Sequence, residues 1–155
     1  ICEHLEEVHP TPRLLPSARS DRAEARRMWR WSEDAFDEVN RTLLSERISQ
    51  WVKRNHRPDS GALRTGSHAL RGRLTFLSAL LETRPNMAGR QVTIADLSIA
   101  ATLSAYDYFG DVQWERMPDL KIWYVRMKSR PAFRPLLMDR LAGVKPVPHY
   151  ADLDF

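Results

Sequence analysis

The chain has 155 residues with a formal net charge of +4, and 28% of its residues are charged. This length fits one domain, and acidic and basic residues are interleaved, so the charge predicts solvated helix faces and no nucleic-acid binding. No apolar run is long enough to span a bilayer, and we expect no membrane insertion. The single cysteine, Cys2, excludes an internal disulfide, and the five histidines lack metal-ligand spacing, so we expect no metal site.

The chain opens inside a helical pattern. Residues 1–8 are expected to form the end of a short helix, and the proline-rich stretch that follows is expected to break it. Prolines this dense indicate a linker, so we place a domain boundary after residue 19. Because there is no initiator Met, we expect the chain to be the C-terminal part of a longer cytoplasmic protein.

A first long helix is predicted from Ser20, which is a candidate N-cap, to about Val52. Its pattern is one apolar stripe at helical spacing, which indicates a face buried against a core. The members of the stripe are Ala25, Met28, Trp29, Ser32, Phe36, Val39 and Leu43.

A second long helix is predicted from Ser60 to the Arg84-Pro85 pair. Gly66 and Gly72 each weaken it by about 1 kcal/mol relative to Ala, or else they allow a close helix crossing. Two long antiparallel helices joined by a short loop predict a helical hairpin.

Three more helices are predicted, over residues 94–109, 118–129 and 132–141, with Gly110 in the left-handed position after the first of them. No segment alternates apolar and polar residues for long enough to indicate a strand. We therefore predict an all-α fold.

The segment before residue 94 has the pattern of a capping box. Thr93 can cap the first turn, and Asp96 can reach back to the Thr93 N–H. Val92 and Leu97 occupy the positions of a hydrophobic staple. We predict that this motif serves folding rather than chemistry, because its residues satisfy the helix end.

The last eleven residues, 145–155, form a tail that Pro146 and Pro148 keep out of a helix. Its tip is acidic, aromatic and apolar. Such a tip is frayed, docks on the body of the chain itself or binds a partner, and the sequence leaves all three open. The candidate partner-binding residues are His149, Tyr150, Asp152, Leu153, Asp154 and Phe155.

Four segments of the chain resemble the C-terminal helical domain of the glutathione transferase fold. They are residues 1–7, 21–26, 88–96 and 129–133. The resemblance implies that residues 1–19 are the last helix of a mostly missing thioredoxin-like domain plus a linker. Residues 20–144 would then be the helical bundle, and residues 145–155 an extended tail.

A narrower resemblance is carried by residues 103–112 with Trp114, by residues 129–140 and by the tip at 149–155. These segments are similar to a group of alphaproteobacterial transferase-like division proteins that bind filaments of the tubulin-like GTPase FtsZ. The resemblance implies a non-catalytic homodimer at the division site. Its partner would be the FtsZ polymer, contacted through the tail, with no cofactor and no catalytic residue.

The alternative is a working glutathione S-transferase, with glutathione bound by residues upstream of this chain. The chain would then supply only the wall of a pocket for electrophiles. The candidate wall residues are Met28, Trp29, Ser32 and Tyr106. Met and Trp at helical spacing are also typical of a plain core, so both interpretations remain open.

Overall fold

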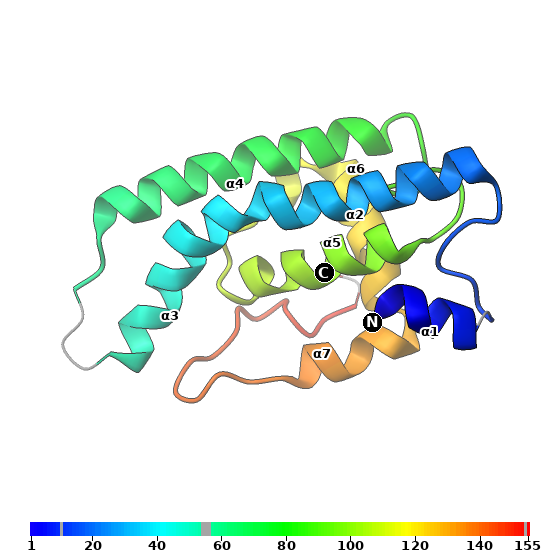
Figure 1. Ribbon diagram of the computed structural model, residues 1–155. Coiled ribbons are helices and arrows are strands. Elements are labelled where there is room, and N and C mark those ends of the chain that lie inside the picture. The colour runs from blue at the N-terminus through cyan, green and yellow to red at the C-terminus, as the bar shows by residue number, and fades with distance from the viewer. Residues whose placement is uncertain (10, 54–56, 154) are drawn as a thin grey trace.

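The computed structural model describes residues 1–9, 11–53, 57–153 and 155. The two long helices, α2 (Arg19–Val39) and α4 (Ser60–Leu81), lie side by side at one side of the bundle (Figure 1). The central helix α5 (Ile94–Tyr108) packs against α2, and α6 (Pro118–Lys128) packs against α4 and α5. The shorter α1 (Cys2–Val8) and α7 (Arg134–Met138) lie on the side of α5 away from α4 (Figure 1).

The remaining elements are short. They are the π-helical turn η1 (Asn40–Leu44), α3 (Ser45–Val52), and two 3₁₀ turns, η2 (Trp114–Arg116) and η3 (Pro131–Phe133). Among the residues that the structure describes, no β-strand forms, and a single isolated bridge joins Asn86 to Gly89. The predicted all-α fold is confirmed.

The predicted apolar stripe of the first long helix forms the core. Its members are 0–2% exposed, except for Trp29, which is half-buried. The stripe faces α4 and α5, whose own buried leucines and alanines complete one continuous core. The 3.6-residue period of the sequence therefore decides which face of α2 packs inward.

Two predicted helix boundaries are wrong. The first long helix begins at Arg19, with Ala18 as an N-cap whose side chain makes no capping bond, so Ser20 lies inside the helix. The last predicted helix, 132–141, is shorter, because a 3₁₀ turn precedes α7 and the backbone becomes extended at Asp139. At this end the Arg140 Nη1 donates to the Leu137 and Asp139 carbonyls at 2.7 Å each, so a side chain satisfies carbonyls at the end of the helix.

A close approach between η1 and α4 explains one of the two predicted helical glycines. A Cβ on Gly66 would lie 2.6 Å from the Leu43 Cβ and 2.7 Å from the Thr42 Oγ1, so only glycine fits there. A Cβ on Gly72 would meet nothing within 4 Å. The prediction of a close helix crossing is thus confirmed at Gly66, and it is wrong at Gly72.

The capping box forms at the start of α5. Asp96 is fully buried, and its Oδ2 accepts from the Thr93 N–H at 2.8 Å and from the Thr93 hydroxyl at 3.0 Å. Its Oδ1 accepts from the Met87 N–H at 2.8 Å and from Trp123 Nε1 at 3.0 Å. The buried charge is stabilised by these donors, and it links α5 to α6 and to the loop after α4. Val92 and Leu97 are half-buried and pack against the core.

The end of α5 also follows the prediction. Gly110 has φ +74°, and the Asp111 N–H donates to the Tyr106 carbonyl at 3.0 Å, which is the closing bond of a Schellman motif. Asp111 then forms an ion pair with Arg47 of α3, whose Nε lies 3.1 Å from Asp111 Oδ2. The C-terminal end of the central helix is thereby tied to α3.

Candidate functional site: the docked tail

The tail folds back onto α5 and α6. The Val147 N–H donates to the Tyr108 carbonyl at 3.1 Å, and the Tyr108 hydroxyl donates to the Val144 carbonyl at 2.6 Å. Tyr150 is only 3% exposed, and its ring meets that of Tyr108 at 5.0 Å between centroids. Two successive turns, closed by the Tyr150 and Asp152 N–H groups, shape the tip. The tail is therefore attached to the packed body at Val144, Val147 and Tyr150.

A buried carboxylate anchors the middle of the tail. Asp107 of α5 is fully buried, and its Oδ1 accepts from Trp114 Nε1 at 2.7 Å. His149 Nε2 lies 2.9 Å from the same oxygen. The other oxygen, Oδ2, has no hydrogen-bond partner among the described residues. A buried carboxylate depends strongly on the partners it has, so Asp107 holds His149 in place.

A buried lysine lies beside this carboxylate. Lys128 of α6 is fully buried, and its Nζ donates to the His149 carbonyl at 3.2 Å. Burial lowers the pKa of Lys128, against the opposing charges of Asp107 and Asp152. Burial likewise raises the pKa of the neighbouring Tyr124, whose hydroxyl has no hydrogen-bond partner among the described residues. The base of the tail thus contains charge that has little access to water.

Phe155 covers this charge. Its ring stacks on His149 at 4.9 Å and 20°, and it meets Trp114 edge-on at 5.5 Å. Lys128 Nζ lies 4.1 Å from the ring centroid and Lys121 Nζ lies 4.9 Å from it, in cation–π geometry. The aromatic ring therefore caps the buried ammonium group.

The predicted tail residues divide by their direction. His149 and Tyr150 point into the body and hold the tail. Asp152 is exposed, whereas Leu153 and Phe155 are half-buried and present part of their surface outward. Asp154 lies outside the described residues. The structure brings five of the six candidates together on one side of α6 and α5, with the apolar pair at the tip.

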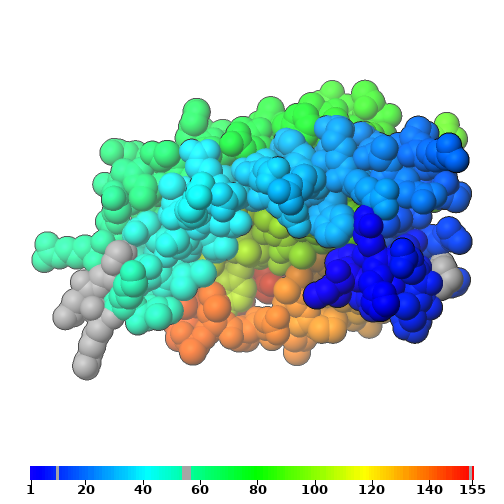
Figure 2. All heavy atoms as spheres, viewed as in Figure 1, coloured from blue at the N-terminus to red at the C-terminus, as the bar shows by residue number. Residues whose placement is uncertain are grey.

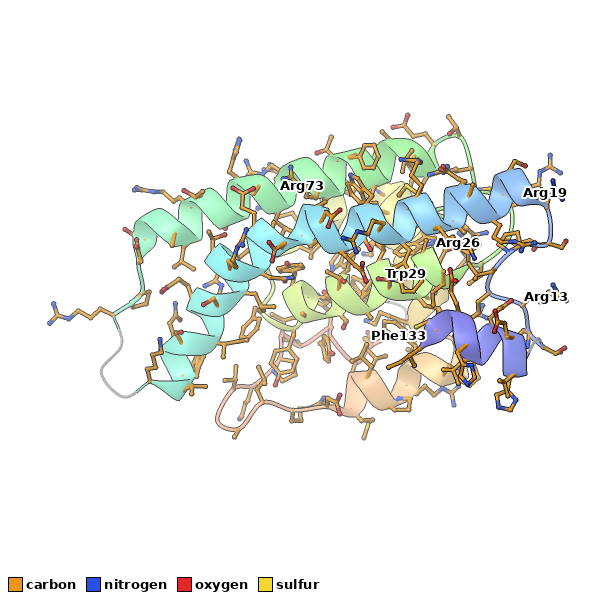
Figure 3. The ribbon with its side chains drawn as sticks, viewed as in Figure 1. Arg13, Arg19, Arg26, Trp29, Arg73 and Phe133 are labelled. Carbon is orange, nitrogen blue, oxygen red and sulfur yellow. The ribbon has the colours of Figure 1, made fainter. Side chains whose placement is uncertain are left out.

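The candidate wall of an electrophile pocket is dispersed. Met28 and Tyr106 are buried in the core, and the Tyr106 hydroxyl donates to Asn40 Oδ1 at 2.7 Å. Ser32 is also buried, with its hydroxyl 3.3 Å from that of Ser98. Trp29 lies on the side of α2 that faces α1 and the start of α5 (Figure 3), where it lines an apolar cavity of about 350 Å³ with Ile94.

A second apolar cavity of about 280 Å³ lies between α3, α5 and the segment after α7. Its lining includes Leu44 and Ile48, the small residues Ala101 and Ala105 of α5, and Leu141. The front of the molecule is hollowed between these elements (Figure 2). The sequence did not single out these residues.

Asp107 and Lys128, which hold the tail, were not predicted from the sequence, although the spacing of their neighbours contains a signal for both. Asp107 follows the buried Ala100 and Leu103 at helical spacing, and Lys128 follows the buried Leu120 and Tyr124 in the same way. A charged residue on an apolar stripe indicates a buried, partnered charge. Both could have been flagged as inward-facing.

The described side chains contain no group of three or more His, Cys, Asp or Glu residues that could hold a metal ion. None of the helices formed by the described residues has the length and apolar character needed to cross a membrane.

Solved structures of glutathione S-transferases share this arrangement of helices. One from Sinorhizobium meliloti 1021 is 41% identical with a TM-score of 0.91, over 99% of this chain and 71% of that one. Another from Rhodospirillum rubrum F11 is 40% identical with a TM-score of 0.87, over 99% of this chain and 70% of that one. The fold is a glutathione transferase C-terminal-like helical bundle.

No protein-family model matches the chain. FtsZ-localized protein A of Caulobacter vibrioides is 48% identical over 156 residues, which is 100% of this chain and 68% of that protein. The structure of FzlA from C. crescentus matches with a TM-score of 0.95 and 47% identity, over 100% of this chain and 69% of that one. The chain belongs to the family of FtsZ-localized protein A, within the glutathione transferase-like superfamily.

Proposed function

We propose that this chain binds FtsZ filaments as a non-catalytic cell-division protein and that the tail makes the contact. The observation that carries the proposal is the 48% identity, along the whole chain, to a protein named for its localisation with FtsZ. The proposed location is the division site in the cytoplasm. We also propose three parts of the chain: residues 1–19 as the end of a thioredoxin-like domain with its linker, residues 20–144 as the helical domain, and residues 145–155 as the tail.

The chemistry of the tip suits a protein contact. Leu153 and Phe155 are apolar side chains of the kind that fill pockets on a partner. The exposed Asp152 adds negative charge, which favours a basic surface and speeds association. His149 and Tyr150 hold the tip in position, because His149 is anchored on α5 and Tyr150 on α5 and α7.

A homodimer would strengthen binding to a filament. We propose that two copies of the chain each present one tail to a repetitive polymer, so that the second contact becomes intramolecular. Loss of both tails would then lower the affinity for the filament by more than the affinity of a single tail accounts for.

The alternative function is conjugation of glutathione to electrophiles. It is favoured by the relatives of 40% and 41% identity that are named glutathione S-transferases, and by the apolar cavity of about 280 Å³ beside α5. In that case glutathione would be a substrate, and the cavity would receive the apolar electrophile. No residue of this chain is assigned as nucleophile or base.

Co-sedimentation of the full-length protein with polymerised FtsZ tests the proposal. Deletion of residues 153–155 is expected to abolish co-sedimentation while the helical circular-dichroism signal stays unchanged. Asp152→Lys is expected to weaken binding by about tenfold through charge reversal. Asp34→Lys is the matched control. The Asp34 side chain on α2 is 68% exposed, and this variant should bind FtsZ normally.

Two outcomes would contradict the proposal. Unchanged co-sedimentation after the deletion would refute the tail contact. Retention on a glutathione column together with conjugating turnover, and no filament binding, would establish the transferase function instead.

A further inference from the structure

Phe155, the most apolar group of the proposed contact, is already in contact with the body of the chain. We call its surroundings the plug site. The plug site consists of Trp114, Lys121, Tyr124, Lys128 and His149. Two cations and three rings converge on this one side chain, and they come from η2, α6 and the tail itself.

A single ring cannot fill two pockets at once. An anchor residue contributes to binding by being fully desolvated in the partner, and here the Phe155 ring is stacked 4.9 Å from His149 and capped on Lys128 at 4.1 Å. We infer that the plug site is an intramolecular competitor that the FtsZ filament must displace to capture Phe155. This inference rests on the proposed function, and it adds a closed state to that function.

The contacts indicate which part of the tail the filament could release. Withdrawal of His149 would leave the fully buried Asp107 with Trp114 as its remaining hydrogen-bond partner among the described residues. Loss of a partner by a buried charge is expensive. Leu153 and Phe155 are half-buried, so their departure re-exposes only part of two apolar side chains. The anchored part therefore ends at Tyr150, and the releasable part begins after the turn that the Asp152 N–H closes on the His149 carbonyl.

The cation beneath the ring makes the closed state stable. Lys128 is fully buried, and its ammonium has the His149 carbonyl and the face of Phe155 as neighbours. A desolvated cation interacts more strongly with an aromatic face than an exposed one does. Removal of the cation should release the ring without any change in the residues that touch the filament.

Variants of the plug site in the full-length protein test the inference. Lys128→Ala is expected to tighten binding to polymerised FtsZ by about threefold to tenfold, because less of the tail is held closed. Lys121→Ala, on the partly exposed rim, should tighten binding by about twofold, and it keeps the test valid if Lys128→Ala folds poorly. Lys53→Ala removes the same charge from an exposed position of the chain and should leave binding unchanged.

Hydrogen exchange provides the independent readout. The Asp152 N–H donates to the same His149 carbonyl that Lys128 holds, so its exchange should accelerate in Lys128→Ala and keep the parental rate in Lys53→Ala. Faster exchange with unchanged or weaker filament binding would overturn the inference, because the docked tail would then be the form that binds. If deletion of residues 153–155 leaves binding intact, the tail contact itself fails, and the competition fails with it.

Discussion

The two buried aspartates of α5 show how much a single residue depends on its donors. Asp96 accepts four hydrogen bonds, from Met87, Thr93 and Trp123, and it serves the fold. Asp107 is equally buried, but its Oδ2 has no hydrogen-bond partner among the described residues. The fully satisfied carboxylate stabilises the helix start, whereas the partly satisfied one needs the tail.

Glu24 gives a pH-dependent prediction at the same scale. Hydrogen bonds from Arg27, and then from Arg84 at 2.9 Å, lower the pKa of Glu24 from 4.5 to about 2 against the effect of burial. Because the folded pKa lies below the unfolded one, this stabilisation is present above pH 4.5 and is lost as the pH falls towards 2.

Glu24→Gln should therefore lower the free energy of unfolding by about 1 kcal/mol at pH 7, after allowance for solvent screening. The difference from the parent should shrink between pH 4.5 and pH 2 in urea titrations, following the pKa of Glu24. Glu33→Gln is the control. The Glu33 Oε2 lies 3.5 Å from Arg30 Nη1 at an exposed site, so this variant should have almost no effect on the free energy of unfolding. A difference that is constant across this pH range would contradict the prediction.

The helices themselves were largely predictable, because their apolar stripes and breakers are strong local signals. The boundaries of α1, α4, α5 and α6 follow the pattern closely. The π-helical turn η1 was not predicted, and it lies where α4 crosses closely at Gly66, a contact that local patterns do not specify. At the end of α7 the Leu141 N–H donates to the distant Tyr108 hydroxyl, which is also a contact made only in the folded bundle.

Gly66 and Gly72 of α4 differ in their surroundings, so alanine substitutions at the two positions should have opposite effects on stability. Gly66→Ala should lower the free energy of unfolding by about 1–3 kcal/mol, since its Cβ would collide with η1. Gly72→Ala should raise it by about 0.5–1 kcal/mol, because the site is open and alanine favours the helix. Urea unfolding of both variants measures the contrast, and effects of the same sign would show that the crossing is not close.

At the scale of the whole molecule, the sequence identified the tail but not its attachment. The acidic and aromatic tip is visible in residues 149–155, so most of the candidate contact could be named in advance. The attachment depends on Tyr108, Asp107 and Lys128, which lie far from the tail in the chain and come near it only in the folded bundle. Local patterns cannot specify such long-range pairs.

Tyr108 connects the tail to the body and gives the last prediction. Its hydroxyl donates to the Val144 carbonyl at 2.6 Å and accepts from the Leu141 N–H at 3.1 Å. Tyr108→Phe should lower the free energy of unfolding by about 1–2 kcal/mol, since both backbone groups lose this partner. Exchange of the Leu141 amide should also accelerate.

Tyr150→Phe is the comparison for that variant, because the Tyr150 hydroxyl has a long bond of 3.4 Å to the Leu136 carbonyl and a side-chain hydrogen bond with Ser104, and it bonds no backbone group of the segment 141–144. Its effect should be smaller, about 0.5–1 kcal/mol. Equal effects of the two variants would show that the Tyr108 hydroxyl does not fasten the tail.

The sheltered ammonium of Lys128 has a chemical consequence. Burial lowers the pKa of this amine, and the aromatic lid that helps to bury it also separates it from reagents in the medium. Acylating reagents would spare this side chain while the lid is shut and attack it readily once the lid lifts. The yield of acylation at one nitrogen would thus measure how often the chain end stands open.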